Sequence, residues 1–189
     1  IALLAPFEEP VPPEKYGGTE LIVSNITETL VNYGHEVYLL ASGDSKTTAK
    51  LIPIFPRAIR KEKITRDLNI RNSLKYIGIG KVLDILKNLK LDIIHNHIGW
   101  RFLPFTKHCN ARTITTLHGP LDPEYQKFVY GSFKNHSYVS ISNDQRKPFP
   151  KLNYIATVYN GIDINLFNFK PDPGSYLAFL GRISPEKGP

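Results

Sequence analysis

The chain has 189 residues, of which 41% are hydrophobic and 22% charged, and its formal net charge is +7. This composition excludes a disordered chain and predicts a sizeable core. The positive charge favours anionic ligands or an anionic membrane surface. No arginine-rich run or aromatic platform indicates a nucleic-acid partner. The single cysteine, Cys109, excludes a disulfide within the chain and indicates a reducing compartment.

No apolar run approaches the ~18 residues that a membrane span needs, and no secretory signal is visible. We therefore expect a cytoplasmic protein, at the inner face of the membrane if its positive charge meets lipid. The sequence contains no Met and begins at Ile1, already inside a strand pattern, so we expect further residues before Ile1. The composition leaves the oligomeric state open.

The first 41 residues are expected to form a βαβ unit, with a strand over 1–5, a helix over 19–33 and a strand over 35–41. The loop before the helix contains Tyr16-Gly17-Gly18-Thr19-Glu20. Because this loop points a helix N-terminus and glycine N–H groups above the sheet, it suits a phosphate or a carboxylate. It matches neither the dinucleotide fingerprint nor the Walker loop. The alternative is a plain tight turn.

A further short strand is expected over residues 51–55, and the stretch that follows it, residues 57–71, is rich in positive charge. Its cations are Arg57, Arg60, Lys61, Lys63, Arg66 and Arg71. A charge run of this kind is usually a solvated face. The alternative is a basic surface that meets an anionic substrate or a lipid headgroup. A helix is expected after it, over residues 74–89.

Two histidines, His95 and His97, mark the end of a strand expected over residues 92–95. Their spacing would allow both to ligate a metal, as in a metal-dependent hydrolase. No second cluster of Cys, Asp or Glu at ligand spacing accompanies them, so we expect no metal site. The other interpretation is a strand end whose polar residues face a cleft.

His118 lies after a β-branched strand expected over residues 112–117, and Gly119-Pro120 forces a turn directly behind it. In open α/β sheets the carboxyl edge of the strands is where ligands bind. His118 is therefore a candidate ligand-binding residue. The alternative is a buried structural histidine.

The end of the chain carries two cations after the last expected strand, residues 176–180. Gly181-Arg182 and Lys187-Gly188 place Arg182 and Lys187 in a loop beside exposed backbone N–H groups. Such a loop can hold a diphosphate, with Arg as a bidentate fork and Lys as a mobile point charge. The alternative is that both are ordinary surface cations.

Strands that alternate with helices predict an α/β fold, a Rossmann-like, mostly parallel sheet with helices on both faces. The remaining elements are short helices over 100–108 and 122–134 and strands over 137–141 and 154–158. Residues 170–174, Lys-Pro-Asp-Pro-Gly, have the composition of a linker. We expect a Rossmann-like domain over residues 1–172. Residues 173–189 would be a linker and the first strand of a second domain.

The sequence resembles the N-terminal half of the family 4 (group 1) glycosyltransferases, which are retaining enzymes with two facing Rossmann-like domains, the GT-B fold. The resemblance runs across nearly the whole chain, and its motifs come in the family's order. They are Tyr16-Gly17-Gly18-Thr19-Glu20, Gly34-His35-Glu36-Val37, the run from Asp92 to His97, Thr116-Leu117-His118-Gly119, the run from Val158 to Asp163, and the run from Gly181 to Gly188.

This resemblance implies a nucleotide-diphosphate sugar as donor, a hydroxyl group as acceptor, and neither metal nor cofactor. Gly17 and Gly18 match the glycine loop beside the donor diphosphate. His118 matches a histidine that contacts the transferred sugar near the reaction centre. Arg182 and Lys187 match the pair that neutralises the diphosphate leaving group. His118, Arg182 and Lys187 are thus the expected catalytic residues.

The resemblance also implies that Glu20, His97 and Asn160, together with His118, face the acceptor or the sugar. The family's Glu-x7-Glu motif, which binds the donor's sugar and nucleotide in the second domain, is absent from these 189 residues. We therefore expect the chain alone to be inactive. The alternatives are a non-catalytic, sugar-phosphate-binding Rossmann-like module, and an epimerase or phosphorylase of the GT-B type.

Overall fold

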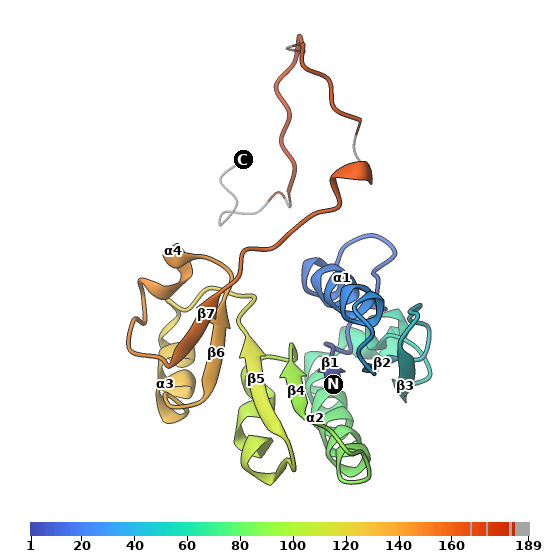
Figure 1. Cartoon of the computed structure of the whole chain (residues 1–189), viewed down its shortest axis with the longest axis vertical. Coiled ribbons are helices and arrows are strands. Elements are labelled where there is room, and N and C mark those ends of the chain that lie inside the picture. The colour runs from blue at the N-terminus through green and yellow to red at the C-terminus, as the bar shows by residue number, and fades with distance from the viewer. Residues whose placement is uncertain (167, 173, 182, 184–189) are drawn as a thin grey trace.

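The computed structural model describes residues 1–166, 168–172, 174–181 and 183, and its strands form one fully parallel sheet in the order β3-β2-β1-β4-β5-β6-β7 (Figure 1). The strands are β1 (Ala2–Leu4), β2 (Tyr38–Ser42), β3 (Lys50–Phe55), β4 (Ile93–Asn96), β5 (Arg112–Thr116), β6 (Ser137–Ser140) and β7 (Tyr154–Thr157). The predicted Rossmann-like α/β fold is confirmed.

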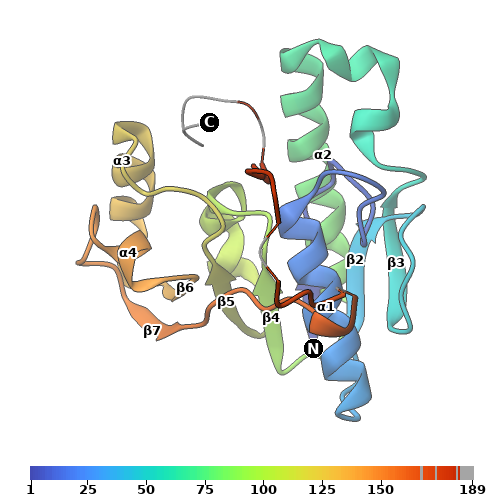
Figure 2. The same ribbon diagram turned by 90° about the horizontal axis from the view of Figure 1, so that it is seen from above.

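Helices cover both faces of this sheet. The helices are α1 (Gly18–Asn32), α2 (Leu68–Leu86), α3 (Glu124–Ser132) and α4 (Asn143–Arg146), with 3-10 helices η1 (Ile59–Lys61), η2 (Lys63–Arg66), η3 (Trp100–His108) and η4 (Ile164–Leu166). The connection through α1 runs from β1 outward to β2, and the connection through α2 runs back the other way to β4. Because parallel crossovers are right-handed, the two helices lie on opposite faces (Figures 1 and 2).

The core is built around β1, an inner strand between β2 and β4, whose three residues are fully buried. Alternate side chains point to opposite faces. Leu3 packs with Val23 of α1 on one face, whereas Leu4 packs with Ile79 and Val82 of α2 on the other. A strand covered on both faces reads as a continuous apolar run, which explains why β1 could be predicted from the sequence.

Helix α1 ends in a glycine turn, and this turn delays the next strand. Gly34 has a φ of 83°. Its N–H donates to the carbonyl of Val31 at 2.9 Å, and the N–H of His35 donates to the carbonyl of Leu30 at 3.1 Å. These two bonds close the helix. The predicted start of β2 at residue 35 was therefore wrong, because His35 closes the turn and β2 begins at Tyr38.

The predicted start of the second long helix, at residue 74, was also wrong. Helix α2 begins at Leu68 because Asp67 caps it: the carboxylate accepts the N–H of Asn69 at 2.7 Å and the N–H of Ile70 at 3.3 Å. This cap satisfies two of the helix's free N–H groups. No helix in the described part of the chain is long and apolar enough to cross a membrane.

Much of the positive charge between residues 57 and 75 pairs with the acidic loop that follows β1. The ion pairs are Arg60–Glu9 at 3.0 Å, Lys61–Glu14 at 2.7 Å and Lys75–Glu8 at 2.5 Å. Arg57 pairs locally with Glu62. The charge run therefore holds a loop in place as well as facing solvent, a role that the sequence interpretation did not include.

The predicted strand over residues 176–180 does not form. Residues 177–180 have no regular structure, and the side chains of Leu177 and Leu180 are fully exposed, at 103% and 101%. A strand needs a neighbour to pair with and an apolar face to bury, and the described residues offer this segment neither. After η4 the chain extends away from the sheet (Figure 1). The proposed domain division at residues 172/173 stays a prediction.

Candidate functional site

A cleft of about 790 Å³ opens at the carboxyl end of the sheet, and we call it the His118 cleft. Six of the predicted site residues line it: Gly17, Gly18, Glu20, His97, His118 and Asn160. They come from four separate segments of the chain. The other two predicted site residues, Arg182 and Lys187, lie outside the described residues.

Strand register explains why the two histidines meet. Strands β4 and β5 are parallel neighbours with Asn96 opposite Thr115. Beyond β4 the N–H of His97 still donates to the carbonyl of Leu4 at 2.9 Å. Because parallel strands end at the same edge, the residues that follow β4 and β5 project side by side into the cleft.

The N-terminus of α1 forms another wall of the His118 cleft. Gly17 is its N-cap and supplies no side chain to the first N–H groups. Glu20 lies in the first turn, and the residue is only 6% exposed. Burial, with a smaller contribution from Glu8 and Glu9, raises the pKa of Glu20 from 4.5 to about 7. Glu20 can therefore hold or release a proton near neutral pH.

Three histidines stack between the strand ends. The ring centroids of His95 and His97 are 4.1 Å apart, and those of His97 and His118 are 5.1 Å apart. Nδ1 of His97 lies 2.8 Å from Nε2 of His118. Burial lowers the pKa of His95 and of His118 to about 4, and it lowers the pKa of His97 well below its ordinary value. All three rings are therefore neutral at pH 7.

The described residues contain no group of three or more His, Cys, Asp and Glu side chains placed to hold a metal ion. The ring nitrogens of the histidines are directed at one another and at Thr116, whose hydroxyl lies 2.7 Å from Nε2 of His95. This geometry gives the metal-hydrolase interpretation of His95 and His97 no third ligand in the described part of the chain.

The backbone around His118 is held by a residue that the sequence interpretation did not select, Gln145. Its side-chain amide nitrogen, Nε2, donates to the carbonyls of Leu117 at 2.9 Å and Gly119 at 2.8 Å. Its Oε1 accepts the N–H of Ile141 at 2.9 Å. The available signal was the Ser-x-x-Gln spacing, since Ser142 caps α4 and places Gln145 in its first turn.

Asn96 holds the neighbouring loop in the same way. The residue is fully buried, and its amide group donates to the carbonyl of Gly99 at 3.1 Å and to the hydroxyl of Thr115 at 3.0 Å. Its Oδ1 accepts the N–H of Ile98 at 2.9 Å. The loop that carries His97 is thus fixed on both sides of the histidine.

The described cleft wall carries no unpaired positive side chain. Arg60 is the only Lys or Arg among the described residues that line it, and Arg60 pairs with Glu9. Glu8 and Glu20 add two further carboxyl groups. Glu8 pairs with Lys75 at 2.5 Å, so the described side chains of this wall do not concentrate positive charge for a diphosphate.

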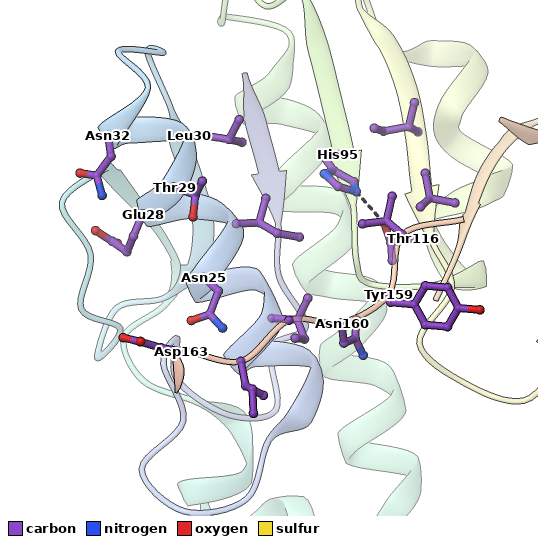
Figure 3. Close-up of a pocket in the computed structure, with 17 residues that line it drawn as sticks. Asn25, Glu28, Thr29, Leu30, Asn32, His95, Thr116, Tyr159, Asn160 and Asp163 are labelled. Atoms are coloured by element: carbon purple, nitrogen blue, oxygen red, sulfur yellow. Dashed lines mark hydrogen bonds between the residues drawn. The ribbon is translucent and has the colours of Figure 1, made fainter. Parts of the chain in front are cut away.

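A second cavity of about 750 Å³, the sheet groove, lies between α1 and the open face of β4, β5 and β6 (Figure 3). Its walls include Ile26 and Leu30 of α1 together with Ile114 and Val139 of the sheet. Residues 158–163 run along its edge and also line the His118 cleft through Asn160, Gly161 and Ile162. This segment therefore borders both cavities.

The parallel sheet and its helices define a Rossmann-like α/β domain, and comparison with known proteins gives its family. The sequence model of Glycosyltransferase Family 4 matches residues 16–166. The chain belongs to this family. No curated protein matches the chain.

A solved structure has the same fold: the crystal structure of AviGT4, a glycosyltransferase involved in Avilamycin A biosynthesis, with a TM-score of 0.57 and 18% sequence identity. The match covers 88% of this chain and 43% of that chain. At this identity the likeness shows the fold alone. The chain spans less than half the length of AviGT4.

Proposed function

We propose that the chain is the acceptor-side part of a retaining glycosyltransferase. It would transfer a hexosyl unit from a nucleotide-diphosphate sugar to a hydroxyl acceptor, in glycan, glycolipid or natural-product biosynthesis. The observation that carries this proposal is the His118 cleft, in which predicted site residues from four segments meet at the carboxyl edge of the sheet. Membership of the family supports it.

The proposed reaction breaks the bond between the sugar's anomeric carbon and the donor phosphate and forms a bond from that carbon to the acceptor oxygen. The acceptor's proton passes to the departing phosphate, so no separate protein base and no metal are needed. Negative charge grows on the diphosphate, and fixed cations stabilise it most in the transition state. We assign this task to Arg182 and Lys187 because the described cleft wall supplies no free cation of its own.

Site-directed replacement of these two cations tests the assignment in the complete enzyme that contains this chain. Arg182→Ala and Lys187→Ala should each lower kcat by about 10²–10³-fold, as expected when a transition-state charge loses its partner. The assay measures product formation from a panel of nucleoside-diphosphate sugars. Near-normal turnover by both variants would remove them from the diphosphate role, and interconversion of donors without an acceptor would indicate an epimerase.

The isolated 189-residue chain should form no product with any donor of that panel. The Glu-x7-Glu motif to which the resemblance assigns binding of the donor's sugar and nucleotide is absent from these 189 residues, and the described cleft wall supplies no unpaired cation. The assay combines the purified chain, a donor and a mixture of hydroxyl acceptors and separates the products by chromatography. Turnover by the isolated chain would contradict this expectation.

We also propose that η2 and the start of α2 contact an anionic membrane surface at the cytoplasmic face. Ile64 and Leu68 are 63% and 65% exposed there. Lys63 and Arg66, beside them, form no ion pair with any described residue. Exposed apolar side chains flanked by cations suit a lipid headgroup boundary.

Vesicle sedimentation tests this contact. The chain should pellet with vesicles that contain anionic phospholipid and remain free with phosphatidylcholine alone, and replacing both Ile64 and Leu68 by Ser should abolish pelleting. Tyr33→Ser, at the exposed far end of α1, is the matched control and should leave it unchanged. Equal behaviour of all three proteins would exclude the contact.

A further inference from the structure

His97 and His118 share a hydrogen bond, and its direction decides the tautomer of His118. Nδ1 of His97 and Nε2 of His118 are 2.8 Å apart. A neutral imidazole carries one proton, so one ring must donate and the other must accept. Only two arrangements are available while both rings are neutral. The choice between them decides which nitrogen of His118 carries its proton.

The surroundings of His97 favour one arrangement. His97 is 3% exposed, and its Nε2 is buried without a hydrogen-bond partner among the described residues. If His118 donated, His97 would hold its own proton on Nε2, as a buried N–H with no acceptor. If His97 donates from Nδ1, its Nε2 is a bare lone pair. Orphaned buried N–H groups are the rarer and costlier case in proteins.

The neighbouring groups do not reverse this choice. His95, which stacks on the other side of His97, uses its Nε2 on the hydroxyl of Thr116 at 2.7 Å. Burial lowers the pKa of His95 and His118 to about 4, and it lowers the pKa of His97 well below its ordinary value. No proton is therefore shared through a charged ring at pH 7.

We propose that His97 is a positioning residue that fixes His118 in the Nδ1–H tautomer. Nε2 of His118 is then occupied as an acceptor. Nδ1 of His118 has no hydrogen-bond partner among the described residues and is not one of the buried atoms, so its N–H is open to the cleft. His118 thus offers a hydrogen-bond donor to a ligand in the cleft, and no free lone pair with which to remove a proton.

The donor role of His118 deepens the proposed function, and it rests on that function only for the identity of the ligand. A neutral N–H donor suits a hydroxyl oxygen of the transferred sugar. The lack of a free basic nitrogen agrees with a reaction in which the departing phosphate takes the acceptor's proton. The tautomer itself requires no substrate and can be measured without any turnover. Failure of the sugar-transfer proposal and failure of the tautomer proposal are therefore separable.

The test is a long-range ¹H–¹⁵N correlation spectrum of the histidine rings in the ¹⁵N-labelled chain at neutral pH. The chemical shift of each ring nitrogen reports whether it is protonated. We expect a protonated Nδ1 and an unprotonated Nε2 in His118, and a protonated Nδ1 in His97. A protonated Nε2 in His118 would overturn the proposal without the need for any variant.

Three variants then separate positioning from packing. His97→Phe keeps a ring but removes the donor, so the Nε2 resonance of His118 should move toward the protonated range. His97→Asn supplies an amide donor near the same place and should retain the Nδ1–H tautomer. His136→Phe removes a histidine that bonds Thr115 instead, at 2.8 Å, and should leave His118 unchanged. An unaltered His118 spectrum in His97→Phe would also refute the assignment. If that variant does not fold, the wild-type and His97→Asn spectra decide.

Discussion

Glu20 holds a carboxyl group that is almost completely buried at the edge of the cleft. Its pKa is raised to about 7, chiefly by burial, whereas the unfolded chain releases the same proton near 4.5. The folded protein therefore binds this proton more tightly, and the stability contributed by the protonated group is lost as the pH rises from about 4.5 to about 7. A shift of this size corresponds to on the order of 3 kcal/mol.

Replacing Glu20 by Gln keeps the shape of the protonated group and removes its titration. We expect the unfolding free energy of the variant, relative to the wild type, to increase between about pH 5 and about pH 8 by on the order of 2–3 kcal/mol. Urea titrations at several pH values measure this difference. A difference that does not depend on pH would mean that Glu20 ionises normally in the folded state.

The test compares the unfolding free energies of variant and wild type because the histidines change the stability with pH in the opposite direction to Glu20. The pKa of His95 and of His118 is lowered to about 4 by burial. The unfolded chain therefore takes up protons first as the pH falls below about 6.5, and stability is lost on acidification. Both proteins in the comparison share this loss, so it cancels.

Gly17 and Gly18 are adjacent, but the structure gives them different surroundings. A methyl group on Gly17 would lie 2.6 Å from Cβ of Pro13 and 3.0 Å from Oε2 of Glu20, whereas one on Gly18 would meet nothing within 4 Å. Gly17→Ala should therefore cost about 1–3 kcal/mol of stability. Gly18→Ala should be neutral or stabilising by up to about 1 kcal/mol, since Gly18 begins a helix.

Urea unfolding of the two glycine variants measures these effects. If the proposed role of the glycine loop holds, Gly18→Ala in the complete enzyme should still weaken donor binding, because the methyl group occupies space beside the diphosphate. Equal stability of both variants would show that the Pro13 loop moves freely to admit the methyl group.

The sequence could place His97 and His118 at strand ends but could not predict that they are bonded. The two residues are 21 positions apart, and their contact depends on β4 and β5 being neighbours in register. Strand order is a long-range property that no local spacing encodes. The same limit applies to Gln145, whose contacts with the His118 loop span 28 and 26 residues.

At the scale of elements, helix α2 is seated on the sheet through a glycine. A methyl group on Gly78 would lie 2.6 Å from Cε2 of Phe7 and 2.9 Å from Cε2 of Phe55. These two rings pack edge to face, with centroids 5.7 Å apart. The small residue lets the helix approach the aromatic pair closely. The hydrophobic pattern of α2 alone did not reveal this contact.

Gly78→Ala and Gly80→Ala form a matched pair within α2. Both gain up to about 1 kcal/mol of helix propensity, but only Gly78→Ala crowds the core, because nothing lies within 4 Å of a methyl group on Gly80. We expect Gly78→Ala to be less stable than Gly80→Ala by about 1–3 kcal/mol. Thermal or urea unfolding gives the comparison. Equal stabilities would mean that α2 can shift away from the sheet at little cost.

Local signals decided which elements the sequence predicted well. The strands β1 and β5 could be recognised because each is a short apolar or β-branched run bounded by turn residues. The predicted boundaries were wrong where a helix cap or a glycine turn overrides the hydrophobic pattern, at Asp67 and at His35. The strand predicted over 176–180 failed for a different reason: its apolar run has the composition of a strand but has no described partner to pair with.

At the scale of the whole molecule, the chain has two parts with different degrees of burial. Residues up to 163 form the sheet, its helices and both cavities. The described residues after 163 expose their large apolar side chains, including Ile164, Leu166 and Phe169. Their hydrogen bonds are local, from the N–H groups of Asn165 and Leu166 to Asp163. This tail therefore contributes little to the stability of the sheet.

A shortened chain ending at Asp163 should consequently unfold at nearly the same urea concentration as the full chain. The described residues that it lacks bury little apolar surface, so we expect a change within about 0.5 kcal/mol, the range usual for surface changes. A chain ending at residue 153 is the control. It also removes β7, whose Thr157 hydroxyl lies 2.8 Å from the hydroxyl of Ser140, and it should unfold far more easily.

The outcome bears on the domain division that the Pro-Gly linker predicts. Full stability of both a chain ending at Asp163 and one ending at residue 172 would mean that the folded domain ends with residues 158–163. The exposed apolar side chains after Asp163 would then be available to pack against another surface. A loss of more than about 1 kcal/mol on removing residues 164–172 would instead place that segment within the folding unit, because contacts that stabilise a domain must be lost when they are deleted. The folded domain would then extend beyond Asp163, and the linker to a second domain would begin after residues 164–172.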